Sequence, residues 1–292
     1  MNPPQKIAAL HDLSCLGRCA LTVIIPTLSV MGYQVVPVPT ALLSTHTGGY
    51  TDMHFHDLTS DMERIKEHFQ SLGTSFRSIY TGFLGSTQQI ETVEHFLRAF
   101  GSQDQKNSTL VLIDPVMGDD GELYSTYTAE LAEGIRHLCQ FASVITPNLT
   151  EACFLTDRPY LNTAHMEQEQ VIAYANELMD DLQTRYSCKI VITGIHLNNG
   201  GVANLGDDGM GKRFFSQQPE CGHSYPGTGD IFASVLLGEL LADTPFDQAV
   251  DAAAGFVAHL IRASVQIPTP TREGVALEPE LWRLAKQTTE RR

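Results

Sequence analysis

Short apolar runs alternate with longer amphipathic segments along most of the chain. Each apolar run ends in a turn signal, as buried strands do. The runs are Lys6–Leu10, Val35–Val38, Ser78–Tyr80, Leu110–Ile113, Ser143–Ile145 and Lys189–Ile192. The segments with helical spacing are Leu21–Met31 (which contains Pro26), Met62–Leu72, Gln88–Phe100, Ala129–Cys139 and Glu167–Leu182. Strands that alternate with helices predict an α/β fold whose parallel sheet is covered on both faces.

The pattern changes in the last third of the chain. Two short strands between Val202 and Phe215 flank the turn Gly206–Gly209, which predicts an antiparallel ribbon. Helices are then expected at Ile231–Leu241, at Phe246–Arg262 and, as a short piece, near Glu280–Lys286. The sequence has no internal repeats and no low-complexity linker. We therefore expect one domain over residues 1–292.

Composition narrows the function. The chain has 292 residues, is 42% hydrophobic and carries a formal net charge of −15. Nucleic acid and anionic membranes need a basic surface, so neither is expected as a partner. The six cysteines form no C-x-x-C pair, and we expect reduced thiols. Neither a signal peptide nor a membrane span is predicted, which favours a cytoplasmic protein.

Polar residues follow the predicted strands. In an open parallel sheet, ligands bind beyond the carboxyl ends of the strands, so these residues should line one cleft. They are Asp12, Ser14, Ser44–Gly49, Thr81–Gly85, Asp114–Gly118, Thr146–Glu151, Thr193 and Gly194. Their hydroxyl, amide and carboxylate groups suit a polar small molecule, although loops are rich in such residues in any case.

The stretch Gly227-Thr228-Gly229-Asp230 precedes a predicted helix. Glycines let backbone amides approach a ligand, and a helix N-terminus favours anions, so Gly227, Thr228 and Gly229 could hold a phosphate. Asp230 could accept a proton from an attacking hydroxyl. The alternative is that Asp230 merely complements the helix dipole. The two roles are compatible, and because the dipole favours the anion, Asp230 is expected to be a weak base that needs help from a metal. The sequence contains no P-loop and no dinucleotide-binding G-x-G-x-x-G after the first strand.

Acidic residues form two further candidates. In "ITPNLTEA", Asn148 and Glu151 have the spacing of a capping box, and Glu151 could also help to hold a hydrated Mg²⁺. In "VLIDPVMGDDGELY", Asp114 ends a strand and faces the expected cleft. Asp119 and Asp120 could be turn residues or could serve a cation.

Two segments could contact an aromatic ligand. In "LLSTHTGGY", His46 lies between Thr45 and Thr47 and offers hydrogen bonds to a heteroaromatic ring, or it is a structural histidine. In "YTGFLGS", Phe83 is either a ring platform between glycines or part of the core.

Taken in order, these motifs resemble the pyridoxal/pyridoxine/pyridoxamine kinase family of the ribokinase-like superfamily. The resemblance runs through "HDLSCLGRCA", "PTALLSTHTGGY", "YTGFLGS", "DPVMGDDG", "ITPNLTEA", "VITG" and "GTGD", and is nearest to the bacterial pyridoxamine kinases. It implies a three-layer α/β/α fold with a small antiparallel ribbon, and transfer of the γ-phosphoryl group of MgATP to the 5′-hydroxymethyl group of a vitamin B6 pyridine. It also implies a homodimer and a monovalent cation such as K⁺.

The resemblance assigns roles to individual residues. Asp230 would be the base, with Gly227, Thr228 and Gly229 as the anion hole. Ser14, Thr45, His46, Thr47 and Phe83 would contact the pyridine. Asp114, Thr146, Asn148, Glu151 and Thr193 would face the nucleotide, with Asp119 and Glu151 serving Mg²⁺. The ribbon Val202–Phe215 and the loop after it would border the adenine.

The chain departs from the family pattern at two places. Members often have Ser-His where this chain has His11-Asp12, so either Ser14 or Asp12 could contact the pyridine. Members often have Tyr where Phe83 stands. The rival functions are a hydroxymethylpyrimidine kinase, which typically has Cys in place of Asp230, a sugar kinase, and a non-catalytic nucleotide or B6 sensor. The sequence does not rank the B6 vitamers.

Overall fold

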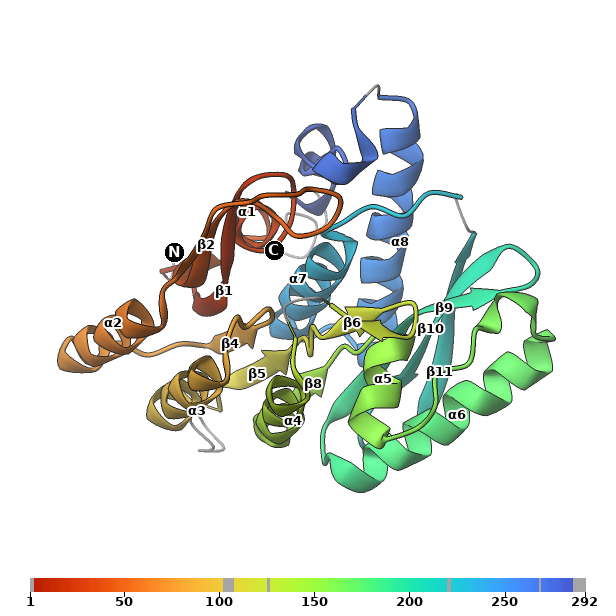
Figure 1. Cartoon of the computed structure of the whole chain (residues 1–292), viewed down its shortest axis with the longest axis horizontal. Helices are drawn as coiled ribbons and strands as arrows, with labels where there is room; N and C mark the ends of the chain where they lie inside the picture. The colour runs from red at the N-terminus through yellow and green to blue at the C-terminus, as the bar shows by residue number, and fades with distance from the viewer. Residues whose placement is uncertain (1–2, 102–107, 125–126, 220–221, 268, 286–292) are drawn as a thin grey trace.

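A nine-stranded sheet forms the centre of the computed structural model, with strand order β11-β10-β9-β8-β5-β4-β1-β2-β3 (Figure 1). The structure describes the chain except residues 1–2, 102–107, 125–126, 220–221, 268 and 286–292. Pairing is parallel from β2 through β1, β4, β5 and β8 to β9, and antiparallel at β3, β10 and β11. The predicted α/β class and the antiparallel ribbon are confirmed.

The strands of the main sheet are β1 Lys6–Leu16, β2 Gln34–Thr45, β3 Phe55–Asp57, β4 Ser78–Thr81, β5 Leu110–Ile113, β8 Val144–Ile145, β9 Lys189–Leu197, β10 Gly201–Asp207 and β11 Arg213–Pro219. The helices are α1 Leu21–Val30, α2 Thr59–Ser71, α3 Thr87–Phe100, α4 Ala129–Leu138, α5 Leu149–Thr156, α6 Gln168–Arg185, α7 Thr228–Leu241 and α8 Phe246–Val265. A separate hairpin joins β6 Gly118–Asp119 to β7 Glu122–Leu123.

Helices cover both faces of the sheet, so the core has two halves. One half packs α2 to α6 against side chains such as Ala8 and Leu10 of β1. The other packs α1, α7 and α8 against Ile7 and Ala9 of the same strand. Adjacent side chains of a strand point to opposite faces, so one short apolar run serves both halves. None of the helices in the described residues is long and apolar enough to cross a membrane.

The structure corrects several predicted boundaries. β1 continues to Leu16 and β2 to Thr45, so Asp12, Ser14 and Ser44 lie within strands rather than after them. The two strands stay paired beyond the rest of the sheet, with an irregularity between His11 and Leu13. The polarity of Asp12, Ser14 and Ser44 suggested a turn, but these residues belong to the strands that border the cleft. β9 likewise runs on to Leu197, and the ribbon turn follows Asp207.

Smaller differences have local causes. The strand β3 and the hairpin β6–β7 were not predicted, because segments of two or three residues carry no periodic signal. The capping box at Asn148 and Glu151 is confirmed. Of the short helix expected near Glu280–Lys286, residues 282–285 are helical, and Lys286 lies outside the described residues.

Gln89 ties the extended strands to the body of the fold. This fully buried side chain of α3 donates to Thr40 O (2.8 Å) and Asp57 Oδ2 (3.0 Å), and its Oε1 accepts the amide of Gly85 (2.8 Å). It therefore joins β2, β3 and the loop after β4. A buried polar group that loses its partner costs about 1–3 kcal/mol.

We predict that Gln89→Met lowers the free energy of unfolding by about 1–3 kcal/mol, because the buried carbonyl of Thr40 and the half-buried amide of Gly85 lose a partner. Chemical denaturation would measure it. The neighbouring Gln88 is exposed and serves as the matched control: Gln88→Met should change stability by less than about 0.5 kcal/mol. Equal stability of the two variants would contradict this role of Gln89.

Candidate active site

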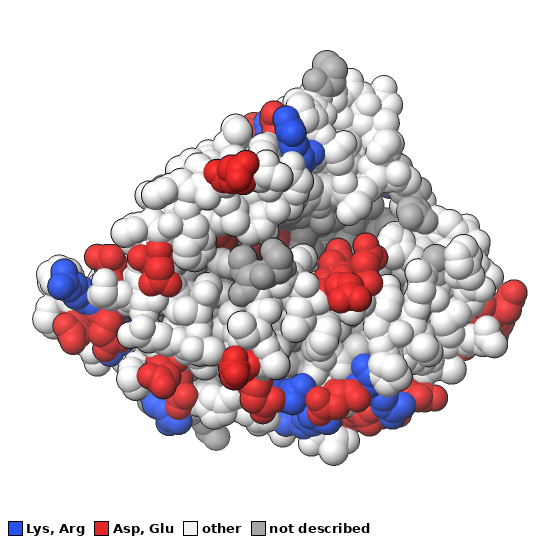
Figure 2. All heavy atoms as spheres, in the orientation of Figure 1, with Lys and Arg blue, Asp and Glu red and all other residues white. Residues whose placement is uncertain are grey.

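The direction of the strand order reverses at β1. β2 and β3 follow on one side of it, and β4, β5, β8 and β9 on the other. Ligands of open α/β sheets bind beyond the carboxyl ends of the strands at such a switch point. Here the start of α7 reaches the end of β1, since Asp230 lies beside His11 and binds the amide of Ala20. Figure 2 shows the molecule hollowed on this face, with acidic side chains gathered over β6 and β7.

The first residues of α7 present an open helix terminus. Gly227 caps the helix in the left-handed conformation (φ 78°), and a side chain there would also collide with the carbonyl of Arg18. Thr228 turns its hydroxyl back to Tyr225 O (3.0 Å). A Cβ added at Gly229 would meet no atom within 4 Å. The first amides of a helix lack partners within the helix, so this terminus can receive an anion.

Asp230 is held at this terminus by a strained residue. Its Oδ2 accepts the backbone N–H of Ala20 (2.8 Å). Ala20 has φ 48° and ψ −134°, a conformation that costs a residue with a side chain about 1–3 kcal/mol. The sequence gave no sign of this contact, because 210 residues separate the two partners. One carboxylate oxygen of Asp230 is thus fixed and the other remains available.

Burial makes Asp230 a stronger base than expected. Its pKa is raised to about 8, chiefly by desolvation and also by the nearby carboxylates of Asp114 and Asp12, although the Ala20 amide lowers it. The expectation that the helix dipole makes Asp230 a weak base is therefore wrong. The carboxylate loses more solvation free energy on burial than it gains from the positive end of the helix dipole.

Asp114 and Glu151 lie together in the adjoining part of the cleft. Asp114 Oδ1 accepts the hydroxyl of Thr146 (3.0 Å), and burial raises the pKa of Asp114 to about 7. Burial and the charge of Asp114 raise the pKa of Glu151 well above its ordinary value. The oxygens of Glu151 already accept the amides of Met117 (3.0 Å) and Asn148 (2.8 Å). Glu151 therefore caps α5 and at the same time lies close to Asp114.

Asn148 and Thr193 link the start of α5 to β6 and β9. The side chain of Asn148 donates to Gly118 O (2.8 Å) and accepts the amide of Glu151 (2.8 Å). Thr193 pairs with Asn148 through an isolated bridge, and its amide donates to Pro147 O (2.8 Å). The predicted nucleotide-facing residues thus lie on one side of the cleft.

Asp119 belongs to the hairpin β6–β7. Its Oδ1 accepts the amide of Asp120 (3.0 Å), which has φ 50°, so both residues form the turn. Burial nevertheless raises the pKa of Asp119. Among the described residues there is no group of three or more His, Cys, Asp or Glu side chains placed to hold a metal ion. A metal in this cleft would need ligands from water or substrate, which suits Mg²⁺.

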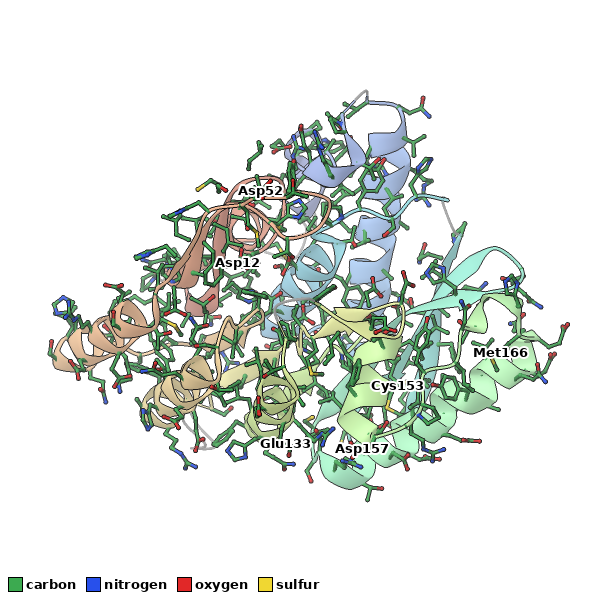
Figure 3. The ribbon with its side chains drawn as sticks, in the orientation of Figure 1. Asp12, Asp52, Glu133, Cys153, Asp157 and Met166 are labelled. Atoms are coloured by element: carbon green, nitrogen blue, oxygen red, sulfur yellow. The ribbon has the colours of Figure 1, made fainter. Side chains whose placement is uncertain are left out.

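The opposite side of the cleft holds the predicted ring contacts. The Ser14 hydroxyl donates to Asp12 Oδ2 (2.8 Å), and both residues are buried, so the two candidate pyridine contacts are neighbours. Asp12 lies on β1 (Figure 3). Thr45 Oγ1 is buried without a partner, whereas Thr47 is exposed. Phe83 is half-buried, packs against the core and contacts the ring of Tyr127 at 6.0 Å between centroids. It is thus at least a core residue.

His46 has a structural role in this loop. Its Nε2 lies 2.6 Å from Arg272 O and so must donate, while its Nδ1 accepts the amide of Gly48 (3.1 Å). Both nitrogens are engaged, so His46 could touch a ligand only through its ring. A second contact supports the same junction, because Arg18 pairs with Glu278 (2.8 Å). The segment 272–278 therefore fastens the loops at 17–20 and 46–50.

Tyr124 lies in the cleft, although the sequence argument did not select it. Burial raises the pKa of its hydroxyl, as do the charges of Glu151, Asp119, Asp114 and Asp230. It stands six residues after Gly118 in the same stretch, "DPVMGDDGELY", that supplied Asp114 and Asp119. The presence of a tyrosine in a segment that already supplied two site candidates was the sequence signal that could have identified Tyr124.

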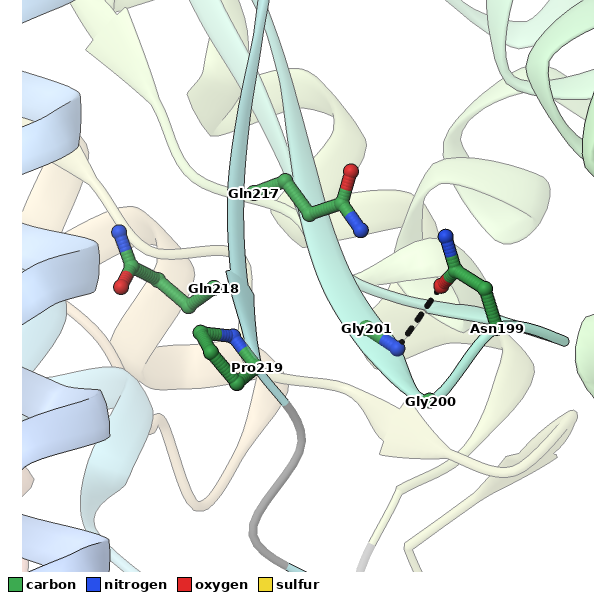
Figure 4. Close-up of a pocket in the computed structure, with 6 residues that line it drawn as sticks. All are labelled: Asn199, Gly200, Gly201, Gln217, Gln218 and Pro219. Carbon is green, nitrogen blue, oxygen red and sulfur yellow. Dashed lines mark hydrogen bonds between the residues drawn. The ribbon is translucent and has the colours of Figure 1, made fainter.

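A separate pocket of about 420 Å³ lies at the end of the ribbon (Figure 4). It is lined by Asn199, Gly200, Gly201, Gln217, Gln218 and Pro219. Asn199 Oδ1 accepts the amide of Gly201 (3.0 Å). None of the individually named site residues lines this pocket, but Gln217, Gln218 and Pro219 directly follow the ribbon Val202–Phe215, next to which the adenine was expected.

Comparison with known proteins identifies relatives of this chain. A sequence profile described as phosphomethylpyrimidine kinase matches residues 23–272. The pyridoxine/pyridoxal/pyridoxamine kinase of Bordetella avium is 27% identical over 289 residues, which are 94% of this chain and 93% of that protein.

Two solved structures share the fold. One, named as a phosphomethylpyrimidine kinase of Bacteroides thetaiotaomicron and crystallised with pyridoxal, has a TM-score of 0.86 and 39% identity and covers 96% of each chain. The other, pyridoxal kinase of Leishmania donovani with ADP and pyridoxamine, has a TM-score of 0.81 and 25% identity and covers 96% of this chain and 95% of that one.

The raised pKa of Asp230 makes stability depend on pH. Below about pH 4 the carboxyl is protonated in both the folded and unfolded states, whereas towards pH 8 folding has to keep it protonated or bury its charge. We predict that Asp230→Asn gains stability relative to the wild type as pH rises from about 4 to about 8, by about 1–3 kcal/mol. Chemical denaturation across this range would measure the difference. A difference that stays constant with pH would contradict the assignment.

Proposed function

The chain belongs to the phosphomethylpyrimidine kinase family, and from this premise we propose that it phosphorylates the 5′-hydroxymethyl group of vitamin B6 vitamers with ATP. The observation that carries the proposal is the half-buried carboxylate of Asp230, with its raised pKa, at the open N-terminus of α7. The kinase relatives, one of them crystallised with pyridoxal and one with ADP, support both substrates. Phosphorylated B6 would then enter the salvage of pyridoxal 5′-phosphate.

The geometry gives each group a part in the transfer. The substrate hydroxyl would lie beside Asp230, which takes its proton as the new P–O bond forms. The raised pKa of Asp230 strengthens it as a base towards an alcohol. The amides of Thr228 and Gly229 would face the charge that develops on the transferred phosphoryl group. Asp12 and Ser14 would border the pyridine ring, and Asn148 and Thr193 the nucleotide.

Mg²⁺ fits the donor set of this cleft. Asp114, Asp119 and Glu151 place negative charge beside the expected phosphates, and Glu151 has both oxygens on backbone amides, so it would act through water. When bound, Mg²⁺ neutralises phosphate charge. We further propose a single domain and a homodimer, as the family resemblance implies, together with a monovalent cation such as K⁺ and a cytoplasmic location.

Hydroxymethylpyrimidine is the second candidate substrate, because the matching profile and the Bacteroides relative carry the phosphomethylpyrimidine kinase name. A substrate panel separates the two candidates. We predict that ADP release with MgATP depends on pyridoxal, pyridoxine or pyridoxamine, with a kcat/KM at least about tenfold above that for hydroxymethylpyrimidine. A coupled ADP assay would measure it. Turnover of hydroxymethylpyrimidine alone would move the assignment to the second candidate.

We predict that Asp230→Asn lowers kcat about 10²–10⁴-fold and leaves ATP binding within about threefold, because the base is lost while the helix terminus remains. Single-turnover kinetics and calorimetric titration with nucleotide would measure the two effects. Asp243 just after α7 is the matched control, because Asn tolerates its left-handed conformation (φ 59°) equally well. Asp243→Asn should turn over normally. Near-normal transfer by Asp230→Asn would reject Asp230 as the base.

A further inference from the structure

The imidazole of His11 is buried against Asp230 without a hydrogen bond. His11 lies on β1 and is 0% exposed. Neither Nδ1 nor Nε2 has a partner, and Nδ1 lies 4.0 Å from Oδ1 of Asp230. Buried polar groups are normally paired, so a buried imidazole that lacks any partner needs an explanation. The nearest charged group is the base proposed above.

The surroundings hold the ring in this position. The ring of Tyr80 on β4 packs edge-on against it, with 4.2 Å between ring centroids. On another side Gly82 leaves the space that the ring fills, since a Cβ there would collide with His11 Cε1 and Nδ1. A side chain enclosed in this way has little room to turn. Its Nδ1 therefore stays directed at the carboxylate.

The two oxygens of Asp230 have different neighbours. Oδ2 is held by the amide of Ala20, and Oδ1 is the oxygen on the side of His11. Burial lowers the pKa of His11 to about 3, so the ring is neutral and carries a single N–H. It can thus donate a hydrogen bond without bringing a positive charge. A carboxylate oxygen has a second lone pair with which it can still take a proton.

We propose that His11 is a positioning residue that donates its Nδ1–H to Oδ1 of Asp230 when the cleft binds its substrates, and so orients the base and stabilises its ionised form. This inference rests on the proposed kinase function. Catalytic hydrogen bonds are often long in unliganded enzymes and tighten in the reacting complex. A movement of about 1 Å brings the pair within hydrogen-bond distance.

The other groups that face Asp230 give the effect a definite sign. They are Asp12 on β1, Cys19 before α1, Tyr80 on β4, Asp114 after β5 and Tyr124 after β7. None of them is a cation, and the carboxylates raise the pKa of Asp230. A donated hydrogen bond stabilises the charged form of a carboxyl group and lowers its pKa. Loss of the His11 donor must therefore raise the pKa of the base.

Two substitutions test the donor. His11→Phe keeps a planar ring without an N–H, whereas His11→Asn keeps a donor near the position of Nδ1. We expect His11→Phe to move the acidic limb of the kcat–pH profile up by about one unit, so that kcat falls about tenfold near neutral pH and recovers at high pH. The KM values should stay within about twofold. His11→Asn should keep the wild-type limb.

The profile separates positioning from a general defect. The full chain would be assayed with MgATP and its best B6 vitamer between about pH 6 and about pH 10. Thr27→Val is the matched control, because Thr27 on α1 also has a buried hydroxyl without a partner, and it should leave the limb in place. A loss in His11→Phe that is equal at every pH, an unshifted profile, or a shift in His11→Asn of the same size would overturn the proposal.

A second readout needs no turnover. Carbon NMR of selectively labelled aspartate, recorded on the complex with ADP and a B6 vitamer, follows the titration of the Asp230 carboxyl, whose signal is identified by its loss in Asp230→Asn. His11→Phe should raise that pKa and His11→Asn should not. An unchanged titration in a complex shown to hold both ligands would overturn the role of His11. Absence of ADP release with every B6 vitamer would reject the proposed function alone.

Discussion

The cleft concentrates carboxylates without a cationic side chain to neutralise them. Asp12, Asp114 and Glu151 are buried at its edges and Asp230 is half-buried there, and no Lys or Arg in the described part of the chain forms an ion pair with any of them. Desolvation raises the pKa of each of the four. An arrangement this costly persists only if the fold imposes it. Because these carboxylates are not neutralised, the cleft favours ligands that bring protons or cations with them.

The fold imposes this arrangement through strands that outrun the sheet. β1 and β2 stay paired up to Leu16 and Thr45, so that polar side chains sit on rigid strands at the switch point. Gln89 of α3 holds β2 by a hydrogen bond to Thr40 O. From the other face of the sheet, α7 brings Asp230 to the same strands. Asp12, Ser14 and Asp230 therefore lie on regular secondary structure, which restricts their positions more than loops would.

The sequence was sufficient for the class of fold and for most of the residues of the cleft. Hydrophobic periodicity and turn residues located the long helices and the core strands, because an element that buries one face has apolar residues at regular spacing. They failed where polarity had another cause: Asp12 and Ser14 read as a turn although they are buried strand residues. The pKa of Asp230, the contact with Ala20 and the engagement of both His46 nitrogens depend on residues distant in sequence. Local sequence patterns do not predict contacts between residues that are far apart in the chain.

The junction that fastens the loops at 17–20 and 46–50 has a consequence for biosynthesis. His46 and Arg272 are 226 residues apart, and Arg18 and Glu278 are 260 apart. A ribosome delivers the chain from its N-terminus, and domains begin to fold as they emerge. The sheet can start to assemble early, but the loop at 46–50 reaches its final form only after the segment 272–278 has left the exit tunnel. Competence to bind a ligand is thus among the last properties that the nascent protein acquires.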